Sequence, residues 1–539
     1  MRIVTSVLSL LVLIAALLGS LTANRSQVFV GGDIYFVDAD CYSRMTRVQQ
    51  VISQPFRRIA QHNFENFPTG TSPHTTAPFD LVIAGLAASI TPFATNAIDL
   101  AGAWVSPVIA LTLLTFLWCW MGRERIPFRF ATLFLIAISP PVVQAFKLGR
   151  PDHQSLTLAL VTAGFVAEIM LRQRPSRPWI IAWGLLWGCA LWVTLYEPLI
   201  LLGIVLVSRF LSPQTTSSSR RGMTVAALIA AAAFLAGVLF DGWRIGPPPP
   251  EVGEYFPRWS TLLGELNSVP PFSGAWLTWF GYLLPAIIPL AIWTSLQSHE
   301  SKSALIEQSI LLISLTVATY GLTIWQVRWS PFFIIPAALL LPAALSAIPS
   351  RVAASVIYAL SLWPLASDWD ARLFPDQTQR SALAEQRTEN VLLRQTSSAL
   401  RSDTITPVLA PWWLCPAIAY WSGQPCVGGS SHQSLPGIVD TSRFYLARTL
   451  VEADEIITKR EVKAVVAYEP DRLISTSATL LDRPPSSNVL ATSIYRNPRA
   501  LPGFTQTYAN PYFRLFSKTS PPMEPSKEDG ATAPATHHH

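Results

Sequence analysis

The segment GGDIYFVDADCYSRMTRVQQ, residues 31–50, follows the first apolar run of the chain and is rich in charge. Its charged residues are Asp33, Asp38, Asp40, Arg44 and Arg47. Carboxylates beside a hydrocarbon layer are costly, so a cluster of them at a membrane boundary indicates a function. The simpler alternative is a solvated loop whose acids pair with the arginines of the same loop. We interpret Asp38 and Asp40 as the front of an active site that faces away from the cytoplasm.

The composition is that of a membrane protein. Of the 539 residues, 50% are hydrophobic and 13% are charged, whereas soluble domains carry about 25% charged residues. The 19 tryptophans agree with this class, because Trp gathers at membrane interfaces. The net charge of +6 is explained by basic cytoplasmic loops. No basic stripe or zinc-finger spacing indicates nucleic-acid binding.

Eleven apolar runs predict membrane-spanning helices. The first, residues 4–23, is long enough at 1.5 Å per residue to cross a hydrocarbon core of about 30 Å. We interpret it as a retained anchor rather than a cleaved signal peptide. The other runs lie at about 100–120, 127–146, 154–171, 178–195, 198–211, 223–240, 274–296, 304–325, 330–348 and 352–367.

The basic residues between the apolar runs indicate which ends of the predicted helices face the cytoplasm. If the short apolar segment 79–91 lies at the outer interface instead of crossing, most basic loops share the cytoplasmic side, as the positive-inside rule expects. These basic residues are Arg123, Arg125, Arg172, Arg174, Arg177, Arg220, Arg221, Lys302 and Arg351. The same topology places the acids of residues 31–50, Asp152, Glu197, Arg328 and the C-terminal part on the outer side.

The predicted fold is a polytopic α-helical membrane protein of about 11 to 13 spans with a small C-terminal α/β domain. The membrane part is residues 1–367, with outer loops at 25–99 and 241–272. Residues 368–518 form the extracytoplasmic domain, and the Pro- and Ser-rich composition of 519–539 indicates a disordered tail.

The C-terminal domain alternates predicted helices and strands. Residues 406–413 (TPVLAPWW) and 463–469 (KAVVAYE) predict strands, and residues 442–462 predict one amphipathic helix. This alternation is typical of an α/β module. A disulfide between Cys415 and Cys426 is one possibility if the domain lies outside the cytoplasm.

The acids at residues 38–40 and the outer-loop sequence Arg150-Pro-Asp152-His153-Gln154 are a candidate metal site. Hard cations such as Mg²⁺ and Mn²⁺ take several oxygen ligands, often from carboxylates on different segments. Asp40 and Asp152 would be the ligands, with His153 or Gln154 completing the shell. The structural alternative for Asp152 is a helix N-cap, and both roles can hold together.

Three basic residues on the outer side are candidates for holding an anion. Lys147 and Arg150 break the charge bias of that side, although scatter in a statistical rule is the alternative. Arg328 offers a rigid fork matched to phosphate oxygens, and it would stabilise a leaving phosphate as its charge grows. The alternative for Arg328 is an arginine that snorkels to the interface.

Trp412 and Trp413, with His432 after a glycine-rich stretch, are candidates for a binding pocket. Taken singly, such tryptophans are more often core or interface residues. Loop 241–272, which contains Glu265, has the length of a lid or binding element.

In this order along the chain, these motifs resemble the catalytic subunit of oligosaccharyltransferase, of the GT-C glycosyltransferase class. The resemblance implies inverting transfer of a glycan from a polyprenyl-linked phosphate or diphosphate to an acceptor on the outer face of the membrane. It implies catalytic roles for Asp38, Asp40 and Asp152, with a divalent cation as cofactor. It assigns the donor phosphate to Arg328, Arg150 and Lys147, and the acceptor side to Trp412, Trp413, His432 and Glu265.

Two departures from the family pattern bear on the substrate. Gln154 stands where relatives carry an acid or a histidine. The family motif WWDYG is here Trp412-Trp413-Leu414-Cys415-Pro416, without the aspartate that recognises Asn-x-Ser/Thr acceptors. We therefore do not expect transfer to such sequons, and the acceptor is another kind of protein site, a lipid or a saccharide.

Two other function classes remain as alternatives. A transporter or flippase of lipid-linked sugars would use similar charges, but transporters usually carry midplane charges and repeated halves. A non-catalytic relative is the other alternative, against which the retention of Asp40, Asp152 and Arg328 argues. The expected location is a bacterial inner membrane, with the C-terminal domain outside the cytoplasm.

Overall fold

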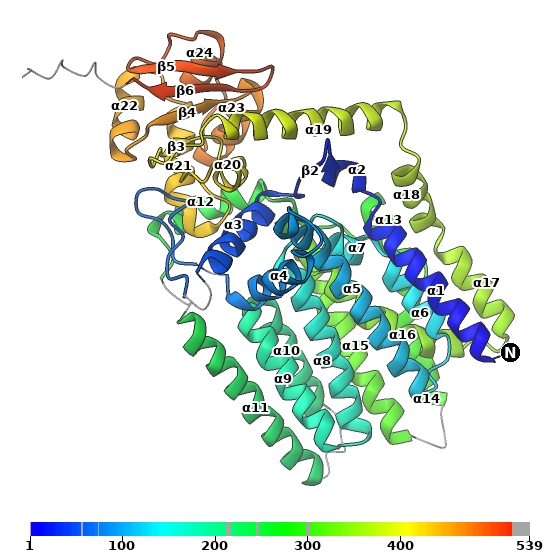
Figure 1. The fold of residues 1–539 in the computed structure, drawn as a ribbon. Coiled ribbons are helices and arrows are strands. Elements are labelled where there is room, and N and C mark those ends of the chain that lie inside the picture. Colours follow the sequence, from blue (N-terminus) through cyan, green and yellow to red (C-terminus); the bar gives the residue numbers. More distant parts are fainter. Residues whose placement is uncertain are drawn as a thin grey trace, which may run out of the picture.

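The computed structural model describes residues 2–54, 58–73, 75–211, 217–243, 247–297 and 302–519. A bundle of apolar helices carries a smaller mixed domain at one end, and a long helix crosses the space above the bundle (Figure 1). The predicted disordered tail falls on residues 520–539, which lie outside the described ranges.

Each predicted apolar run folds as one helix or as two consecutive helices. They are α1 (Arg2–Leu21), α5 (Ala97–Arg123), α6 (Arg129–Ile138), α7 (Pro140–Phe146), α8 (His153–Gln173), α9 (Arg177–Val193), α10 (Tyr196–Phe210), α11 (Ser217–Asp241), α13 (Gly274–Phe280), α14 (Leu284–Gln297), α15 (Lys302–Trp325), α16 (Ser330–Ser346), α17 (Arg351–Ser361) and α18 (Trp363–Leu373).

The helices differ in whether they are long enough to cross a membrane alone. In the described part of the chain, five helices have sufficient length and apolar character, and the pair α6–α7 makes a sixth candidate with a bend of 64°. The bend falls at Pro140 and Pro141, because proline cannot continue the helical hydrogen bonding. The remaining runs form shorter helices. The prediction of a polytopic α-helical protein is confirmed.

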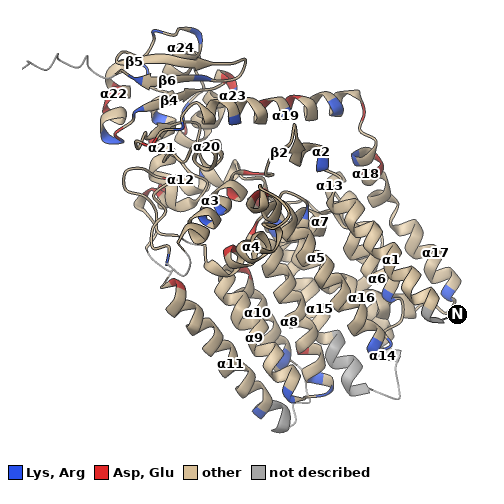
Figure 2. Ribbon diagram, in the orientation of Figure 1, with Lys and Arg blue, Asp and Glu red and all other residues tan. Residues whose placement is uncertain are grey.

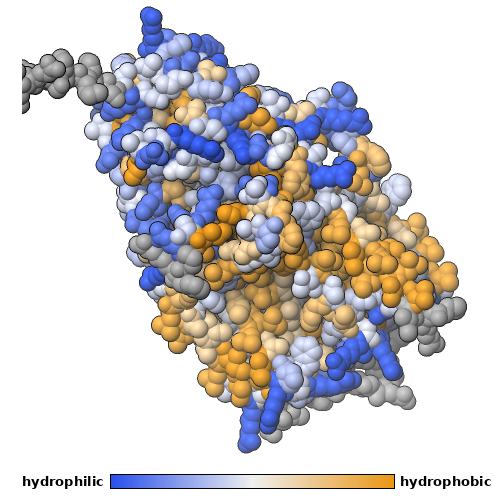
Figure 3. Space-filling view, in the orientation of Figure 1, coloured by the Kyte–Doolittle hydropathy of each residue, from blue (hydrophilic) through white to orange (hydrophobic). Residues whose placement is uncertain are grey.

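The surface of the bundle agrees with this class. Apolar side chains cover the bundle between two polar ends (Figure 3). Basic residues gather at the end of the bundle opposite the C-terminal domain (Figure 2). Inside, nearly every described side chain of α16 is buried against its neighbours, as expected for a helix that is apolar on all sides. The chain is an integral membrane protein.

The outer segments lie between the bundle and the C-terminal domain. They are α2 (Arg25–Val28), β1 (Phe29–Val30), β2 (Asp33–Ile34), α3 (Ala39–Ser53), α4 (Ala77–Ile90), α12 (Pro250–Thr261), η1 (Gly264–Leu266) and η2 (Val327–Trp329). The segment predicted as an interfacial helix is α4, and it packs against α3 and α5.

The C-terminal domain is a small α/β unit, as predicted. Its elements are α19 (Gln377–Ser398), β3 (Val408–Leu409), α20 (Cys415–Ser422), η3 (His432–Ser434), α21 (Leu435–Tyr445), α22 (Leu450–Lys459), β4 (Ala464–Ala467), α23 (Pro470–Leu481), α24 (Leu490–Arg496), β5 (Phe504–Ala509) and β6 (Arg514–Lys518). The strand order is β3-β4-β6-β5, with β3 parallel to β4 and the other pairs antiparallel.

Two details differ from the sequence expectation. The single helix predicted over residues 442–462 is two helices, because Thr449 caps a new helix by accepting a hydrogen bond from the Glu452 amide at 3.3 Å. The hairpin β5–β6 was not predicted. Cys415 and Cys426 are free thiols, and Sγ of Cys426 donates to the carbonyl of Cys415 at 3.4 Å.

Candidate active site

A cavity of about 1410 Å³ lies where α3, the start of α8, η1 and η2 meet α19 and the C-terminal domain. Of the predicted site residues, it is lined by Asp38, Asp40, Arg150, Asp152, His153, Gln154, Glu265, Arg328, Trp412, Trp413 and His432. Lys147 is absent from the lining. The structure therefore brings residues from five distant segments to one space.

The N-terminus of α3 places Asp38 and Asp40. Asp38 is the N-cap and accepts a hydrogen bond from the Cys41 amide at 3.0 Å, while Asp40 stands in the first turn. Protein surrounds the Asp40 carboxylate, although its side chain is open to the water of the cavity. Burial and the charges of Asp38 and Glu265 raise the pKa of Asp40 to about 8. Asp40 is therefore largely protonated at neutral pH, because its surroundings disfavour the charged form.

Asp152 is held from both sides at the start of α8. It caps the helix by accepting from the Gln154 amide at 3.4 Å, as the structural alternative expected. Its carboxylate also lies 2.8 Å from Nδ1 of His153 and 3.2 Å from the Arg150 guanidinium. Although burial raises the pKa of Asp152, the charges of His153 and Arg150 hold it well below its usual value. Asp152 is therefore ionised.

Arg150 joins the two acidic segments. Its guanidinium lies 3.4 Å from the Asp38 carboxylate and 3.2 Å from that of Asp152, and the residue is 7% exposed. A buried guanidinium between two carboxylates holds the start of α3 beside the start of α8. Lys147 caps the C-terminus of α7 nearby, where burial and the charge of Arg150 lower its pKa to about 8.

Arg328 binds two carboxylates from other loops. It forms an ion pair with Glu197, at the start of α10, and lies 3.6 Å from Glu265 in η1. The guanidinium also lies over the ring of Tyr196, 5.3 Å from its centre. In the described part of the chain, Nε of Arg328 and Oε2 of Glu197 are buried without hydrogen-bond partners. The ion pair of Arg328 and Glu197 thus places a guanidinium in the lining of the cavity.

Glu265 connects the arginine to the acidic side of the cavity. Its Oε2 accepts a hydrogen bond from the Gln154 side chain at 3.2 Å, and Oε1 of Gln154 accepts from Arg150 at 3.4 Å. Polar contacts therefore run without a break from Arg328 to Asp38. Sequence reasoning missed Glu197 as the partner of Arg328, although an acid at the outer end of a span was a usable signal.

Arg44 and Arg47 do not pair with the acids of their own segment. Both bind Asp80 of α4, each at 2.8 Å, and all three side chains are buried. Among the described residues, Asp33 pairs instead with Arg394 of α19 at 2.9 Å. The alternative of a solvated loop with internal ion pairs is therefore not what the structure has.

His62 and Glu65 extend this buried network to the C-terminal domain, and sequence reasoning did not single them out. Nε2 of His62 lies 2.8 Å from Arg47, and Nδ1 lies 3.2 Å from Glu65. Glu65 accepts hydrogen bonds from Thr71 and Ser434, both at 2.7 Å. Although burial raises it, these partners lower the pKa of Glu65 to about 2.

The C-terminal domain supplies an aromatic wall. The rings of Trp412 and Trp413 meet edge to face with centres 5.6 Å apart, and Trp259 of α12 packs on Trp412 at 5.9 Å. Leu414, in the place of the family's aspartate, also lines the cavity. Trp412 and Trp413 are thus both packing residues and cavity residues.

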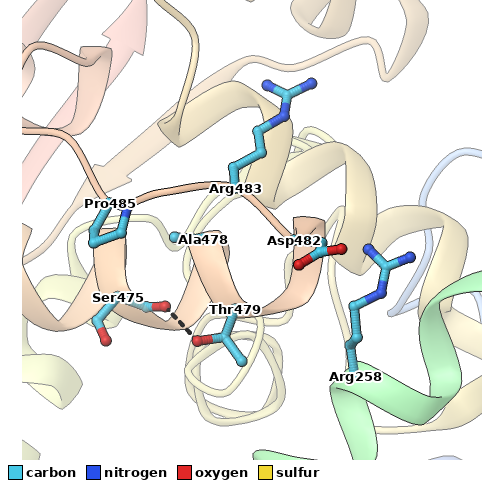
Figure 4. A pocket seen from close by; sticks show the side chains of 7 residues that line it. All are labelled: Arg258, Ser475, Ala478, Thr479, Asp482, Arg483 and Pro485. Carbon is cyan, nitrogen blue, oxygen red and sulfur yellow. Dashed lines mark hydrogen bonds between the residues drawn. The ribbon is translucent and has the colours of Figure 1, made fainter.

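A second pocket of about 350 Å³ lies apart from the cavity, where α12 meets α23 (Figure 4). Arg258 of α12 donates to the Leu480 carbonyl at 3.3 Å. Figure 4 shows Arg258 of α12 and Asp482, at the end of α23, among the residues that line this pocket. The hydrogen bond from Arg258 to Leu480 joins the outer loop that carries Glu265 to the C-terminal domain.

The cavity residues fit a divalent cation in donor type and charge. Four carboxylates, Asp38, Asp40, Asp152 and Glu265, line the cavity beside Arg150 and Arg328, and burial together with the neighbouring acids raises the pKa of Asp40. Among the described residues, no three His, Cys, Asp or Glu side chains are close enough to form a ready metal centre. Cation binding would need small movements of these side chains.

Replacing Asp80 with asparagine tests the buried network. The change leaves Arg44 and Arg47 without their carboxylate, so we expect a loss of about 3–5 kcal/mol in the free energy of unfolding. Thermal unfolding in detergent measures this. Asp471→Asn, an exposed aspartate, is the control, and equal melting temperatures for the two variants would contradict the structural role.

Comparisons with known proteins identify the fold. No protein-family model matches the sequence, and no curated protein matches it significantly. Among solved structures, it is similar to the archaeal oligosaccharyltransferase AglB from Archaeoglobus fulgidus, in complex with an inhibitory peptide and a dolichol-phosphate. The TM-score is 0.59 at 15% identity, covering 86% of this chain and 69% of that one. The same archaeal enzyme has been solved in complex with Zn and sulfate (TM-score 0.58, 14% identity, 85% and 68% covered).

Two further structures share the architecture. ArnT from Cupriavidus metallidurans matches with a TM-score of 0.52 at 12% identity, covering 95% of this chain and 97% of that one. The arabinofuranosyltransferase AftD from Mycobacteria matches with 0.57 at 14% identity, covering 94% of this chain and 41% of that one. All three proteins are GT-C glycosyltransferases. The chain has the GT-C glycosyltransferase fold.

Proposed function

We propose that the protein is an inverting glycosyltransferase that uses a polyprenyl-linked phosphate or diphosphate donor on the outer face of a bacterial cytoplasmic membrane. One observation carries the proposal: Asp40, Asp152 and Arg328, from three distant segments, line one cavity at the end of the apolar bundle away from most basic loops. Similarity to an enzyme solved with a dolichol-phosphate supports a lipid-linked donor. A transporter would need such charges near the membrane midplane, which favours the enzyme.

Asp40 is the proposed base. A general base works best when its pKa lies near the working pH, and a value of about 8 meets this condition. Asp40 would accept a proton from the acceptor while the nucleophilic atom of the acceptor attacks the anomeric carbon of the donor sugar. The bond from that carbon to the phosphate oxygen breaks on the opposite side, which inverts the configuration. Asp38 and Asp152, held by Arg150, orient the acceptor beside it.

Arg328 is the proposed ligand of the leaving phosphate. Although burial lowers it, the charges of Glu197 and Glu265 raise the pKa of Arg328, so the guanidinium stays charged. A fixed cation stabilises the negative charge that develops on the phosphate as the bond breaks. Arg150 lines the same cavity and adds positive charge. Lys147, outside the lining, would act only through its electrostatic field.

Asp40 and Asp152 would hold a Mg²⁺ or Mn²⁺ ion, with His153 and Gln154 adjacent to Asp152. Such an ion supplies electrostatic stabilisation to a departing phosphate. Gln154 contributes an amide oxygen instead of a carboxylate, so the site would carry one negative charge fewer than an acidic pair. The similarity to an enzyme solved in complex with Zn and sulfate supports the binding of a metal ion.

The acceptor side is proposed as Trp412, Trp413, His432 and Glu265. Leu414 offers no carboxylate to an acceptor hydroxyl, so we propose an acceptor other than an Asn-x-Ser/Thr sequon. Residues 1–367 would form the membrane domain and residues 368–518 an extracytoplasmic domain that shares the site.

Asp40→Asn should abolish transfer while donor binding persists. Loss of the base is expected to lower turnover by about 10²–10⁴-fold. The assay is release of label from a polyprenyl-linked sugar by the purified protein, with donor binding measured separately. Asp33→Asn, in the same segment but bonded to Arg394, is the matched control. Full turnover in the Asp40 variant would exclude this enzyme mechanism.

Removal of divalent ions should also stop turnover. Treatment with a chelator leaves the carboxylates around Asp40 uncompensated, so we expect activity to disappear and to return with Mg²⁺ or Mn²⁺. The same titration followed by label release gives the preferred ion. Undiminished activity in the chelator would remove the metal from the proposal and leave the base and the arginine in place.

Arg328→Lys should fail to restore function despite its charge. Lysine cannot contact Glu197, Glu265 and a phosphate at once with a fixed fork, and we expect about a 10²–10³-fold loss in turnover. Arg496→Lys, at an exposed arginine of the C-terminal domain outside the cavity, should be near wild type. Wild-type kinetics in the Arg328 variant would show that the phosphate binds elsewhere.

A further inference from the structure

One face of α19 lines the same cavity as Asp40, and we call this part of the cavity the groove. The lining residues of this helix are Ala382, Glu385, Gln386, Glu389, Asn390 and Leu393. Their spacing of three and four residues places them on a single stripe. At 1.5 Å per residue the stripe is about 16 Å long, room for a chain of about three sugar units. No assigned role covers this part of the cavity.

The C-terminal domain contributes aromatic side chains to the groove beside α19. Trp413 packs edge to face on Tyr468 at 6.3 Å, and Tyr512 lies further along. The Arg472 guanidinium covers the Trp413 ring at 5.4 Å, but its side chain is 54% exposed and its contact to Glu389 is long, at 3.7 Å. Arg472 also donates to the Tyr468 hydroxyl at 3.1 Å, so it lies over the aromatic residues of the groove while half of its side chain stays in solvent. Sugar rings stack on aromatic surfaces through their C–H faces.

Two acids of α19 accept hydrogen bonds from tyrosines of the C-terminal domain, whereas two amide side chains of the helix have no such bond in the described part of the chain. Glu389 accepts a hydrogen bond from Tyr468 at 2.8 Å, and Glu385 accepts from Tyr512 at 3.3 Å. Among the described residues, the side chains of Gln386 and Asn390 make no hydrogen bond. An amide both donates and accepts, which matches the hydroxyl groups of a sugar.

The charge of the groove and the helical backbone of α19 disfavour two classes of ligand, acidic polymers and extended peptides. Glu385, Glu389 and Glu469 outnumber Arg472, so an acidic polymer is repelled. The main chain of α19 is bonded within the helix and presents no strand edge to a peptide. The groove offers side-chain amides and aromatic rings instead.

We propose that this groove binds a neutral oligosaccharide chain lengthwise along α19, with one end at Asp40. The proposal rests on the proposed function and names its substrate class. The chain is either the acceptor or the glycan of the donor, and both present the same chemistry to Gln386, Asn390 and Trp413.

Direct binding tests the groove without turnover. The purified full-length protein in detergent is titrated calorimetrically with neutral gluco-, manno- and N-acetylglucosamine oligosaccharides of increasing length. Oligogalacturonides and an unmodified sequon peptide complete the set. We expect affinity to rise up to about three units, matching the length of the stripe. The acidic oligosaccharides and the peptide should bind more weakly.

The double variant Gln386→Ala/Asn390→Ala should weaken oligosaccharide binding by about tenfold, through the loss of two side-chain hydrogen-bonding groups. Gln377→Ala removes an exposed amide from the same helix outside the cavity, and its affinity should equal that of the wild type. Within the described ranges, neither altered side chain makes a hydrogen bond, so the melting temperature of the double variant should equal that of the wild type.

Label release from the lipid-linked donor is measured in parallel. If the wild type releases label but binds none of the oligosaccharides, or binds the peptide instead, the groove proposal is overturned while the proposed function stands. If oligosaccharides bind but no label is released, the groove stands and the proposed function fails. Transfer of label onto a bound oligosaccharide identifies it as the acceptor, whereas binding that only competes with the donor identifies the donor glycan.

Discussion

Buried arginines and the carboxylates that neutralise them hold the site together. Arg150 lies between Asp38 and Asp152, and Arg328 lies between Glu197 and Glu265. A guanidinium without its counterion is costly away from bulk water, so each arginine requires the loop that carries its acid. These requirements fix the start of α3 against the start of α8, and η2 against η1. Five segments, at the starts of α3, α8 and α10 and at η1 and η2, therefore meet around two buried arginines.

Among the described residues, the two arginines pair with Asp38, Asp152, Glu197 and Glu265. Asp40, the proposed base, lies outside these ion pairs. Asp152 is ionised by its close partners, while the pKa of Asp40 is about 8 because burial and neighbouring acids outweigh the hydrogen bond from Ser430. Two carboxylates from similar helix starts therefore differ in proton affinity. Environments that separate the pKa values of neighbouring acids are typical of sites in which one acid is structural and the other moves a proton.

Sequence reasoning succeeded where local patterns determine the structure. Apolar runs predict helices because each run must bury its own backbone polar groups, and α16 and α5 formed as expected. Asp152 was predicted as an N-cap for a local reason as well. Partner choice is not local: Asp80 is more than thirty residues from Arg44, and no spacing rule connects them. Thr449, a short polar residue inside an amphipathic pattern, was the overlooked local signal that split one predicted helix into two.

The position of α19 also could not be predicted, and it determines what the cavity can recognise. Its sequence is that of a polar helix, whose partners depend on where α18 ends and how the C-terminal domain turns back. In the fold, Arg394 of α19 lies between Asp33 and the ring of Tyr35, which fixes the helix to the N-terminal segment. The helix face beside the aromatic wall then faces the same space as Asp40. Leu414 removes the carboxylate with which the resembled family reads its acceptor, while α19 adds amides further along the cavity. Under the proposed function, these amides of α19 lie in the same cavity as Trp412 and Trp413 of the proposed acceptor side.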